Sequence, residues 1–399
     1  RQEEKGEGIM NRFKSIAKGF KLKYYINYIL VALLLGVFTA LLLTGNLKPS
    51  NATLVTQIGF SIILAVSLNL VVGFLGELSL GHAGFMCIGA YIGGIFAMNL
   101  IKVFPNKLAV LVISMIVGGL IAAVFGFIIG LPSLRLKGDY LAIVTLAFGE
   151  IVRNICKNQK IFGGAMGLST GSIKYDTRQA PTLFIVTLVT ALVMLAVIQN
   201  LMRSKHGRAI TAIRDNEIAA KAMGINVTFY KLLAFVVSAF FAGVAGVIYA
   251  HYATPVLYTF FSYNYSIEIL VMVVLGGMGN ITGSIVAATL IPVINFFLQK
   301  QLSGNLAALK FLIYAIILIV IVIFGNAPAL KDFREKYSLS NLFRKKHFDP
   351  SARRDDDAAW DRVPTKIQMD EILTTELKPN EAFTPDKPDR PKSGGKENK

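Results

Sequence analysis

The sequence predicts an all-α polytopic membrane protein with about ten transmembrane helices. Of its 399 residues, 54% are hydrophobic and only 16% are charged, which is too apolar for an ordinary soluble domain. Apolar runs of about 20 residues, the length that crosses the hydrocarbon core of a bilayer, recur along the chain. Lysine and arginine gather at the chain ends and in the short connections between these runs, as is typical of membrane proteins.

The positions of the apolar runs predict where the chain crosses the membrane. The eighth run is short, and glycine-containing breaks at 76–81 and 279–281 interrupt apolar sequence, so we expect broken helices there. The first run follows a basic segment, as in a signal peptide, but no small-x-small cleavage site follows, so we predict a permanent span. The ten predicted spans are residues 25–45, 53–75, 82–101, 108–131, 139–157, 181–201, 231–253, 265–278, 282–299 and 306–325.

The distribution of basic residues predicts the orientation of the chain. Residues 1–23 contain seven Lys and Arg, so the amino terminus is expected in the cytoplasm. Ten crossings then place the loop 203–230 and the carboxyl terminus on the same side. The segment 158–180, predicted outside, carries three basic residues and fits this orientation less well. The net charge of +17 is thus explained by topology, and nucleic-acid binding is not expected.

The composition divides the chain into three parts. A basic cytoplasmic segment, 1–24, precedes a transmembrane domain, 25–330, which contains the cytoplasmic loop 203–230. Beyond residue 330 the sequence becomes charged, proline-containing and poor in apolar residues. Such a tail buries too little apolar surface to offset the entropy lost on ordering, so residues 331–399 are predicted to be disordered.

Glycine pairs four residues apart predict close helix packing. Small residues at this spacing share one helix face and let two backbones approach where lipid supplies no hydrophobic drive. The pairs are Gly89 with Gly93, Gly126 with Gly130, and Gly279 with Gly283.

The chain lacks the residues that an enzyme would need. Its nearest approach to a phosphate-binding loop, residues 76–83 (GELSLGHA), has His82 where the lysine should be and Ala83 where the Mg²⁺-binding hydroxyl should be. Cys87 and Cys156 have no metal-ligand spacing and are expected to be free, buried thiols. We therefore predict no catalytic residues, no cofactor, no metal site and no nucleotide hydrolysis by this chain.

Four ionisable residues within or beside the spans are candidates for a transport pathway or a gate: Glu77, His82, Glu150 and Glu268. Charged groups in a membrane are costly and mark either a pathway or a structural pair. Glu150 and Arg153 share a helix face, so mutual neutralisation is the more economical interpretation. Glu268 lies close enough to the interface to be solvated, and His82 is expected to bind backbone carbonyls freed at the break.

A polar segment at 208–225 (RAITAIRDNEIAAKAMGI) separates two long apolar runs. Asp215 or Asn216 is expected to cap a helix through residues 218–223, with Gly224 ending it. The periodicity predicts that one face contacts the membrane domain and the other faces water. The first face comprises Ile210, Ile213, Ala219 and Met223, and the second comprises Arg214, Glu217 and Lys221.

The segment 217–224 (EIAAKAMG) resembles the cytoplasmic EAA loop of permease subunits of bacterial ABC importers, whose core is E-A-A-x-x-x-G. Ala219, Ala220 and Gly224 match, whereas Glu217 lies one place early and the usual Leu-Pro is absent. The chain resembles the branched-chain amino acid branch of these permeases over roughly residues 25–330. The further segments that carry the resemblance are 68–85 (LNLVVGFLGELSLGHAGF), 139–153 (DYLAIVTLAFGEIVR), 163–168 (GGAMGL) and 274–283 (VLGGMGNITG).

The resemblance implies an importer subunit in the bacterial cell membrane. Its implied partners are a second, homologous permease, two cytoplasmic ATPase subunits and an extracellular solute-binding protein. The implied mechanism is alternating access, with nucleotide binding biasing a two-state membrane domain. Carried over by position, the residues that would couple the spans to the ATPase are Asp215, Glu217, Ala219, Ala220 and Gly224.

Other functions are compatible with parts of the sequence. Within the same class, a urea or short-chain amide importer shares the SLGHAGF-like and GGMG-like segments. An ion-coupled secondary transporter would use His82 and Glu77 as proton carriers. A third hypothesis is a membrane scaffold that recruits partners through the tail.

Overall fold

The computed structural model describes residues 27–33, 36, 49–134, 138–175, 180–301, 316 and 319. Within these ranges the chain is helical, and its sole strand-like feature is an antiparallel bridge between Leu168 and Val256. The predicted all-α class is therefore confirmed for this part of the chain. The segments 1–24 and 331–399, and most of the spans 25–45 and 306–325, lie outside the described residues.

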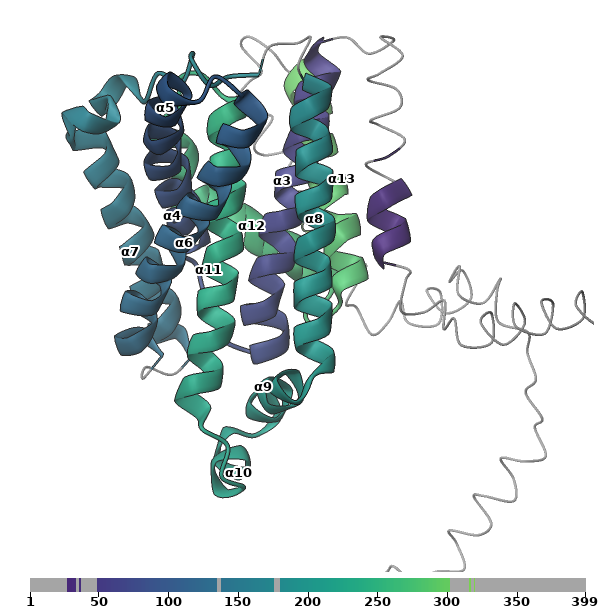
Figure 1. The fold of residues 1–399 in the computed structure, drawn as a ribbon. Helices are drawn as coiled ribbons and strands as arrows, with labels where there is room; N and C mark the ends of the chain where they lie inside the picture. The colour runs from purple at the N-terminus through teal and green to yellow at the C-terminus, as the bar shows by residue number, and fades with distance from the viewer. Residues whose placement is uncertain are drawn as a thin grey trace, which may run out of the picture. The chain divides into compact units, whose positions relative to one another are not determined.

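The described helices follow the predicted apolar runs closely (Figure 1). Two of the long helices contain a turn of wider, π-helical pitch, which is labelled η, as are the short 3₁₀ turns. The elements from residue 49 are α3 (Pro49–Asn69), η2 (Leu70–Leu75), α4 (His82–Ile88), η3 (Gly89–Gly93), α5 (Gly94–Val103), α6 (Lys107–Ser133), α7 (Asp139–Asn158), η4 (Lys160–Phe162), η5 (Gly164–Met166), α8 (Ala180–Arg203), α9 (Lys205–Asp215), α10 (Glu217–Ala222), α11 (Val227–Tyr252), η6 (Tyr258–Phe261), α12 (Tyr263–Gly276) and α13 (Ile281–Gln301).

Six of the described helical segments are long and apolar enough to cross a membrane, so the predicted count of ten is not confirmed. The segment 139–157 does form α7, but Glu150, Arg153 and Lys157 make it too polar to be one of the six. The eighth predicted span is α12, which is apolar but only 14 residues long. The six are Leu54–Leu75, His82–Val103, Lys107–Ser133, Pro181–Arg203, Val227–Tyr252 and Ile281–Leu298.

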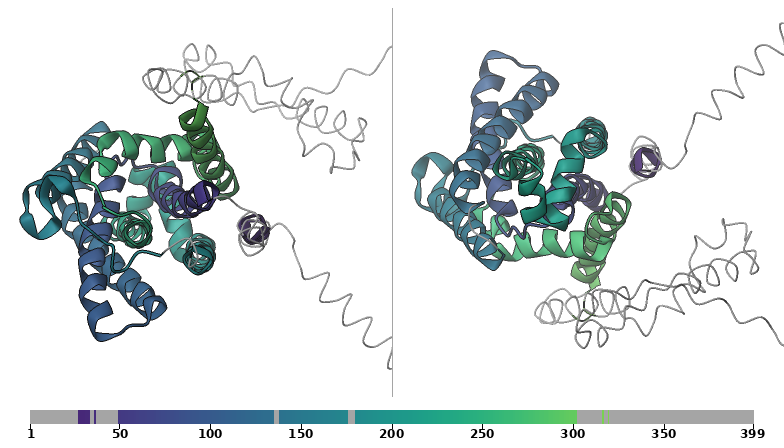
Figure 2. Two further views of the ribbon diagram at one scale, coloured as in Figure 1. Left: turned by 90° about the horizontal axis from the view of Figure 1, so that it is seen from above. Right: turned by 90° about the horizontal axis from the view of Figure 1, so that it is seen from below.

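Helix α11 lies at the centre of the bundle and packs against α3, α4, α6 and η3. In the end views of Figure 2, α8 and α11 are seen along their axes, whereas the green helix α12 is seen from the side. Helix α12 therefore runs across the bundle, from α7 towards α13. The consequence is that residues at its two ends contact different groups of helices.

Glycines allow the close approach of the central helices. A Cβ atom on Gly89 would collide with the backbone carbonyl of Gly243 on α11, and one on Gly126 would lie 2.6 Å from the Cβ of Ala239. The predicted pairs Gly89/Gly93 and Gly126/Gly130 are thus packing faces, as expected. The third pair was predicted wrongly, because Gly279 lies in the turn before α13 with φ +80° and shares no helix face with Gly283.

The predicted break at 76–81 divides two apolar helices. The wide turn η2 ends at Gly76, which has φ +81°, and residues 76–81 are not helical before α4 begins at His82. Backbone donors freed at the break find hydroxyl partners on other helices. The amide of Leu80 donates to Thr145 Oγ1 at 3.0 Å, and that of Ala83 donates to Ser266 Oγ at 3.1 Å.

Replacing Gly89 by Ala is expected to lower stability by about 1–3 kcal/mol, because the added methyl group must displace the backbone of α11. The measurement is the midpoint of thermal unfolding in detergent. The matched control is Gly171→Ala, since a Cβ at Gly171 would meet no atom within 4 Å. Equal midpoints for the two variants would contradict the packing described above.

Candidate functional site

Two short helices, α9 and α10, connect α8 to α11 at one end of the bundle (Figure 1). Ser204 caps α9 by accepting a hydrogen bond from the amide of His206 at 3.1 Å. Asn216 caps α10 by accepting from the amide of Ala219 at 3.0 Å. Gly224, with φ +81°, follows the end of α10. The cap is therefore Asn216, whereas Asp215 is the last residue of α9.

The buried faces of these helices were predicted correctly for α9 and wrongly for α10. Ile210 and Ile213 are buried in α9, as expected. In α10 the buried residue is Ala220, while Ala219 and Met223 are exposed. The reason is that Asn216 has an extended backbone, with φ −158° and ψ 104°, so α10 starts in a new direction and does not continue the face of α9.

The outward side of α10 carries an apolar patch, consisting of Ile218, Ala219, Ala222 and Met223. Ile218 is 79% exposed and Met223 is 83% exposed. At helical spacing these four residues cover one side of the helix, and Glu217 and Ala220 lie on the other. Apolar side chains gathered on one side of a short helix form a candidate contact surface for another protein.

On the opposite side, Glu217 binds a buried lysine. Lys231 Nζ lies 3.0 Å from Glu217 Oε2 and also donates to Glu77 Oε1. The side chain of Lys231 is 3% exposed, that of Glu77 13% and that of Glu217 37%. This ion triad, Glu77–Lys231–Glu217, joins α10, the second turn of α11 and the break at 76–81.

The triad brings together Glu77 and Glu217, two of the candidate residues predicted from the sequence. Lys231, which connects them, was not among the candidates. A single ammonium serves two carboxylates, so the triad has a formal charge of −1. Burial of Lys231 is tolerated because both carboxylates compensate its charge. The sequence contained one signal for the role of Lys231: this lysine is the first residue of the apolar run that was predicted as the span 231–253. Because α11 begins earlier, at Val227, Lys231 lies inside the helix.

A second contact links α9 to the same broken segment. Arg214 Nη1 donates to the carbonyl of Gly73 at 3.2 Å, and its Nη2 lies 3.0 Å from Asp215 Oδ1. Arg214 is exposed, as expected, but its guanidinium also reaches the broken segment, which was not predicted. The aliphatic part of Arg214 packs at Gly76, where a Cβ would lie 2.7 Å from its Cγ.

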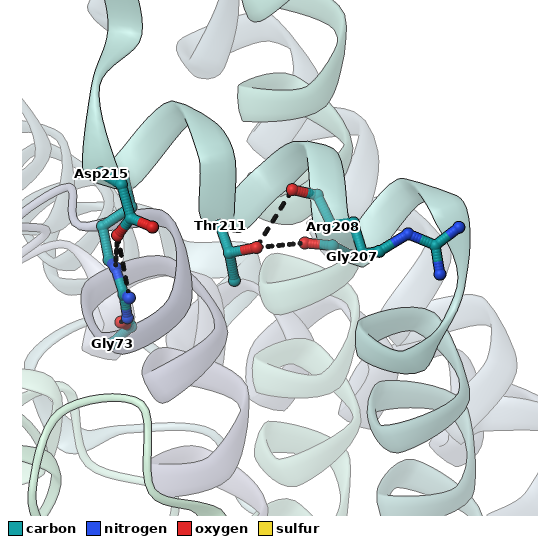
Figure 3. Close-up of polar contacts among 6 residues, drawn as sticks. Gly73, Gly207, Arg208, Thr211 and Asp215 are labelled. Carbon is teal, nitrogen blue, oxygen red and sulfur yellow. Dashed lines mark hydrogen bonds and ion pairs between the residues drawn. The ribbon is translucent and has the colours of Figure 1, made fainter. Parts of the chain in front are cut away.

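Figure 3 shows the polar contacts along α9. Asp215 lies beside Gly73, whereas the guanidinium of Arg208 extends to the opposite side of the view. Between them, Thr211 Oγ1 donates to the carbonyls of Gly207, at 3.2 Å, and Arg208, at 3.0 Å. The hydroxyl of Thr211 is thus used within α9, and the link to the broken segment comes from its last turn.

The broken segment is also tied to the turn between α12 and α13. Asn69, which is fully buried, accepts from the amide of Gly279 at 2.9 Å and donates to Ser284 Oγ at 3.1 Å. A Cβ on Gly73 would collide with the amide nitrogen of Gly279. The α9–α10 loop, the segment 70–81 and the turn 277–280 therefore meet at Gly73.

His82 interacts with a hydroxyl and with a backbone carbonyl, both on α3. Its Nε2 lies 2.9 Å from Ser67 Oγ, and that hydroxyl donates to the carbonyl of Leu64 at 3.0 Å. A backbone carbonyl is thus a partner, as expected, but it is that of Leu64 within α3 and not one at the break. His82 is buried at the first turn of α4 and ties the two sides of the break together.

Glu150 and Glu268 each hold helices together. Glu150 pairs with Arg153 at 2.5 Å, as predicted, and Glu150 Oε1 also accepts from the amide of Tyr263 at 3.0 Å. That carboxylate therefore neutralises the positive end of α12. Glu268 was expected to be solvated, but its Oε1 accepts from Asn295 Nδ2 at 2.6 Å, which links α12 to α13.

The two cysteines are free and buried, as predicted, with Cys87 Sγ 3.7 Å from Cys156 Sγ. Among the described residues, no group of three or more His, Cys, Asp or Glu side chains is arranged to hold a metal ion.

The main feature of the site is a continuous set of polar contacts. These contacts connect the exposed helix α10 and the end of α9 to the break at 76–81 inside the helical bundle.

Comparison with known proteins identifies similar chains. Residues 50–322 match the family model described as "Branched-chain amino acid transport system / permease component". The high-affinity branched-chain amino acid transport system permease protein LivM of Salmonella typhimurium is 38% identical over 264 residues, which cover 58% of this chain and 60% of that relative. LivM of Escherichia coli is 34% identical over 312 residues, which cover 70% of each chain. The permease protein LivH of the Escherichia coli high-affinity branched-chain amino acid transport system is 24% identical over 258 residues, which cover 60% of this chain and 82% of LivH.

Replacing Asn69 by Leu keeps the side-chain size but leaves the amide of Gly279 without its acceptor, so we expect a loss of about 1–3 kcal/mol of stability. The local readout is hydrogen exchange, which should become faster at Gly279. Asn99→Leu is the control, because Asn99 is exposed on α5. Unchanged protection of Gly279 in Asn69→Leu would show that Asn69 does not hold this turn.

Proposed function

The chain belongs to the family of permease components of branched-chain amino acid transport systems, and on that premise we propose that it is the membrane-spanning subunit of an ABC importer for these amino acids. The observation that carries the proposal is the pair of opposite faces on α10. One face is an exposed apolar patch suited to a protein partner, and the other is joined by an ion triad to a break in the membrane domain.

In this proposal the apolar patch of α10 docks into a groove of a cytoplasmic ATPase. Small side chains at Ala219 and Ala222 allow close contact, while Ile218 and Met223 supply most of the apolar area. Gly224 permits the turn by which the chain leaves the docked helix. Glu217 holds the helix to the membrane domain, and Asp215 neutralises Arg214 beside it.

The ATPases would drive alternating access. Their closure on nucleotide would move α10, and the contacts of Arg214 with Gly73 and of Lys231 with Glu77 would pass the movement to the segment 70–81. A helix with a break in the membrane domain can take two arrangements more readily than a continuous one. The candidates for the gate are then Glu77 and His82, at the break, and Glu150 and Glu268, at the contacts of α12 with α7 and α13.

A second, homologous permease would complete the pathway. The support is that two different permeases, LivM and LivH, carry the name of the same high-affinity system in Escherichia coli and that this chain is similar to both. The greater identity to LivM favours the role of the LivM-type subunit for this chain. An extracellular solute-binding protein would deliver the amino acid to the end of the bundle opposite α10.

We propose that the protein lies in the bacterial cell membrane, with α10 and both termini in the cytoplasm. The support for this orientation is the proposed docking of α10 on a cytoplasmic ATPase, because basic residues occur at both ends of the bundle. Lys205, Arg208 and Lys221 lie near α10, and Lys102, Lys157 and Lys160 lie at the other end. The energy of transport would come entirely from the separate ATPase subunits.

Replacing Met223 by Glu should weaken association with the ATPase about tenfold or more, because a carboxylate would be forced into an apolar contact. The measurement is the amount of ATPase that co-purifies with the permease from membranes. Met166→Glu provides the matched control, since Met166 is 86% exposed but lies near the opposite end of α11, two residues before Leu168, which pairs with Val256. Equal co-purification from the two variants would rule out docking through α10.

The substrate can be tested with the complete complex in proteoliposomes. Uptake of labelled leucine should require ATP inside and the binding protein outside, and excess isoleucine or valine should compete with it. Urea and acetamide should not compete. Uptake driven by a proton gradient without the ATPase would instead favour a secondary transporter.

A further inference from the structure

We propose that Lys231 is the positioning residue through which a movement of α10 reaches the break at 76–81. This inference rests on the proposed function, in which α10 is the element that the ATPase moves. It assigns to Lys231 a role in coupling that goes beyond compensating a buried charge.

The two carboxylates around Lys231 are not equivalent. Glu77 is 13% exposed and Glu217 is 37% exposed, while Lys231 is almost fully buried. A buried ammonium needs at least one close carboxylate, because an unpaired charge in apolar surroundings is very unfavourable. Glu217 can exchange its bond for water more readily than Glu77 can. The Glu77–Lys231 contact is therefore the permanent part of the triad, and the Lys231–Glu217 contact is the exchangeable part.

The location of Lys231 suits a connecting role. It lies in the second turn of α11, the central helix of the bundle, and its ammonium lies between two segments that are 140 residues apart in sequence. Glu77 directly follows Gly76, where the backbone turns with φ +81°. A pull on Glu77 therefore acts at the point where the broken helix changes direction.

Arg214 provides a second attachment to the same segment. It binds the carbonyl of Gly73, so the loop contacts the chain on both sides of Gly76. The Arg214 contact involves an exposed side chain that also binds Asp215. The contact through Lys231 joins three charged groups, and its Glu77–Lys231 part is buried, so we assign the main transmission to it.

The test uses the complete complex in proteoliposomes, with both permeases, the ATPases and leucine-loaded binding protein. The quantity measured is leucine taken up per ATP hydrolysed, together with the amount of ATPase bound to each variant. The variants are Glu217→Gln, Lys231→Met and the triple charge inversion of Glu77→Lys, Lys231→Glu and Glu217→Lys. Lys205→Met is the control for loss of a positive charge, since Lys205 is exposed at the start of α9.

Glu217→Gln leaves the buried pair intact, so it should fold and bind ATPase normally while uptake per ATP falls about tenfold, the scale of coupling between linked sites. In Lys231→Met, leucine uptake per ATP should fall at least as much as in Glu217→Gln. The triple inversion restores both attractions and should raise uptake per ATP above that of Glu217→Gln, a recovery that a purely structural role of one residue would not give. Lys205→Met should match the unmodified protein.

The inference would be overturned if assembled Glu217→Gln complexes kept the uptake per ATP of the unmodified protein. It would also be overturned if the triple inversion assembled but remained as poor as the single variant. If Lys231→Met does not assemble into a complex, the uptake per ATP of Glu217→Gln alone decides whether the inference holds. Failure of the proposed function is distinguishable, because the unmodified chain itself would then bind no ATPase and take up no leucine.

Discussion

A break in a helix within apolar surroundings leaves backbone groups that only the protein itself can satisfy, and much of this membrane domain is arranged around that requirement. The interruption at 76–81 frees donors that Thr145 and Ser266 accept from two other helices. The polar side chains that approach it from further helices, Lys231 and Arg214, add charge-assisted contacts. The break is consequently the place where α3, α7, α11, α12 and the α9–α10 loop are held together, and the same contacts make it sensitive to movement of that loop.

The central helices are held differently, by shape rather than by polarity. Gly89, Gly126 and Gly243 allow backbones to approach so closely that a methyl group would not fit. In a bilayer, where burial of apolar surface gives no advantage over lipid, such close packing supplies the cohesion. The bundle thus combines a closely packed, glycine-rich centre around α11 with a polar junction at one end.

The sequence predicts local features of this structure well and distant contacts poorly. The break at 76–81, a cap at Asp215 or Asn216 and the stop at Gly224 depend on neighbouring residues, whose spacing is visible in the chain. The pairing of Lys231 with Glu77 spans 154 residues and leaves no periodic signal. The exposed face of α10 was mispredicted because the chain turns at Asn216, and helical periodicity cannot be continued across an extended residue. For α7, the pairing of Glu150 with Arg153 could be predicted from their spacing, whereas the bond of Glu150 to the amino-terminal end of α12 joins residues 113 apart and could not.

Because α12 runs across the bundle, it connects contacts that lie at its two ends. Its amino-terminal end is held by the carboxylate of Glu150 on α7, and the turn at its other end is held by Asn69 beside the break. Its 14 residues make a rod of about 21 Å. A rod fixed at both ends cannot shift at one without rotating or shifting at the other. A displacement at the turn beside Gly73 would therefore also act on the bond between the other end of α12 and Glu150 on α7.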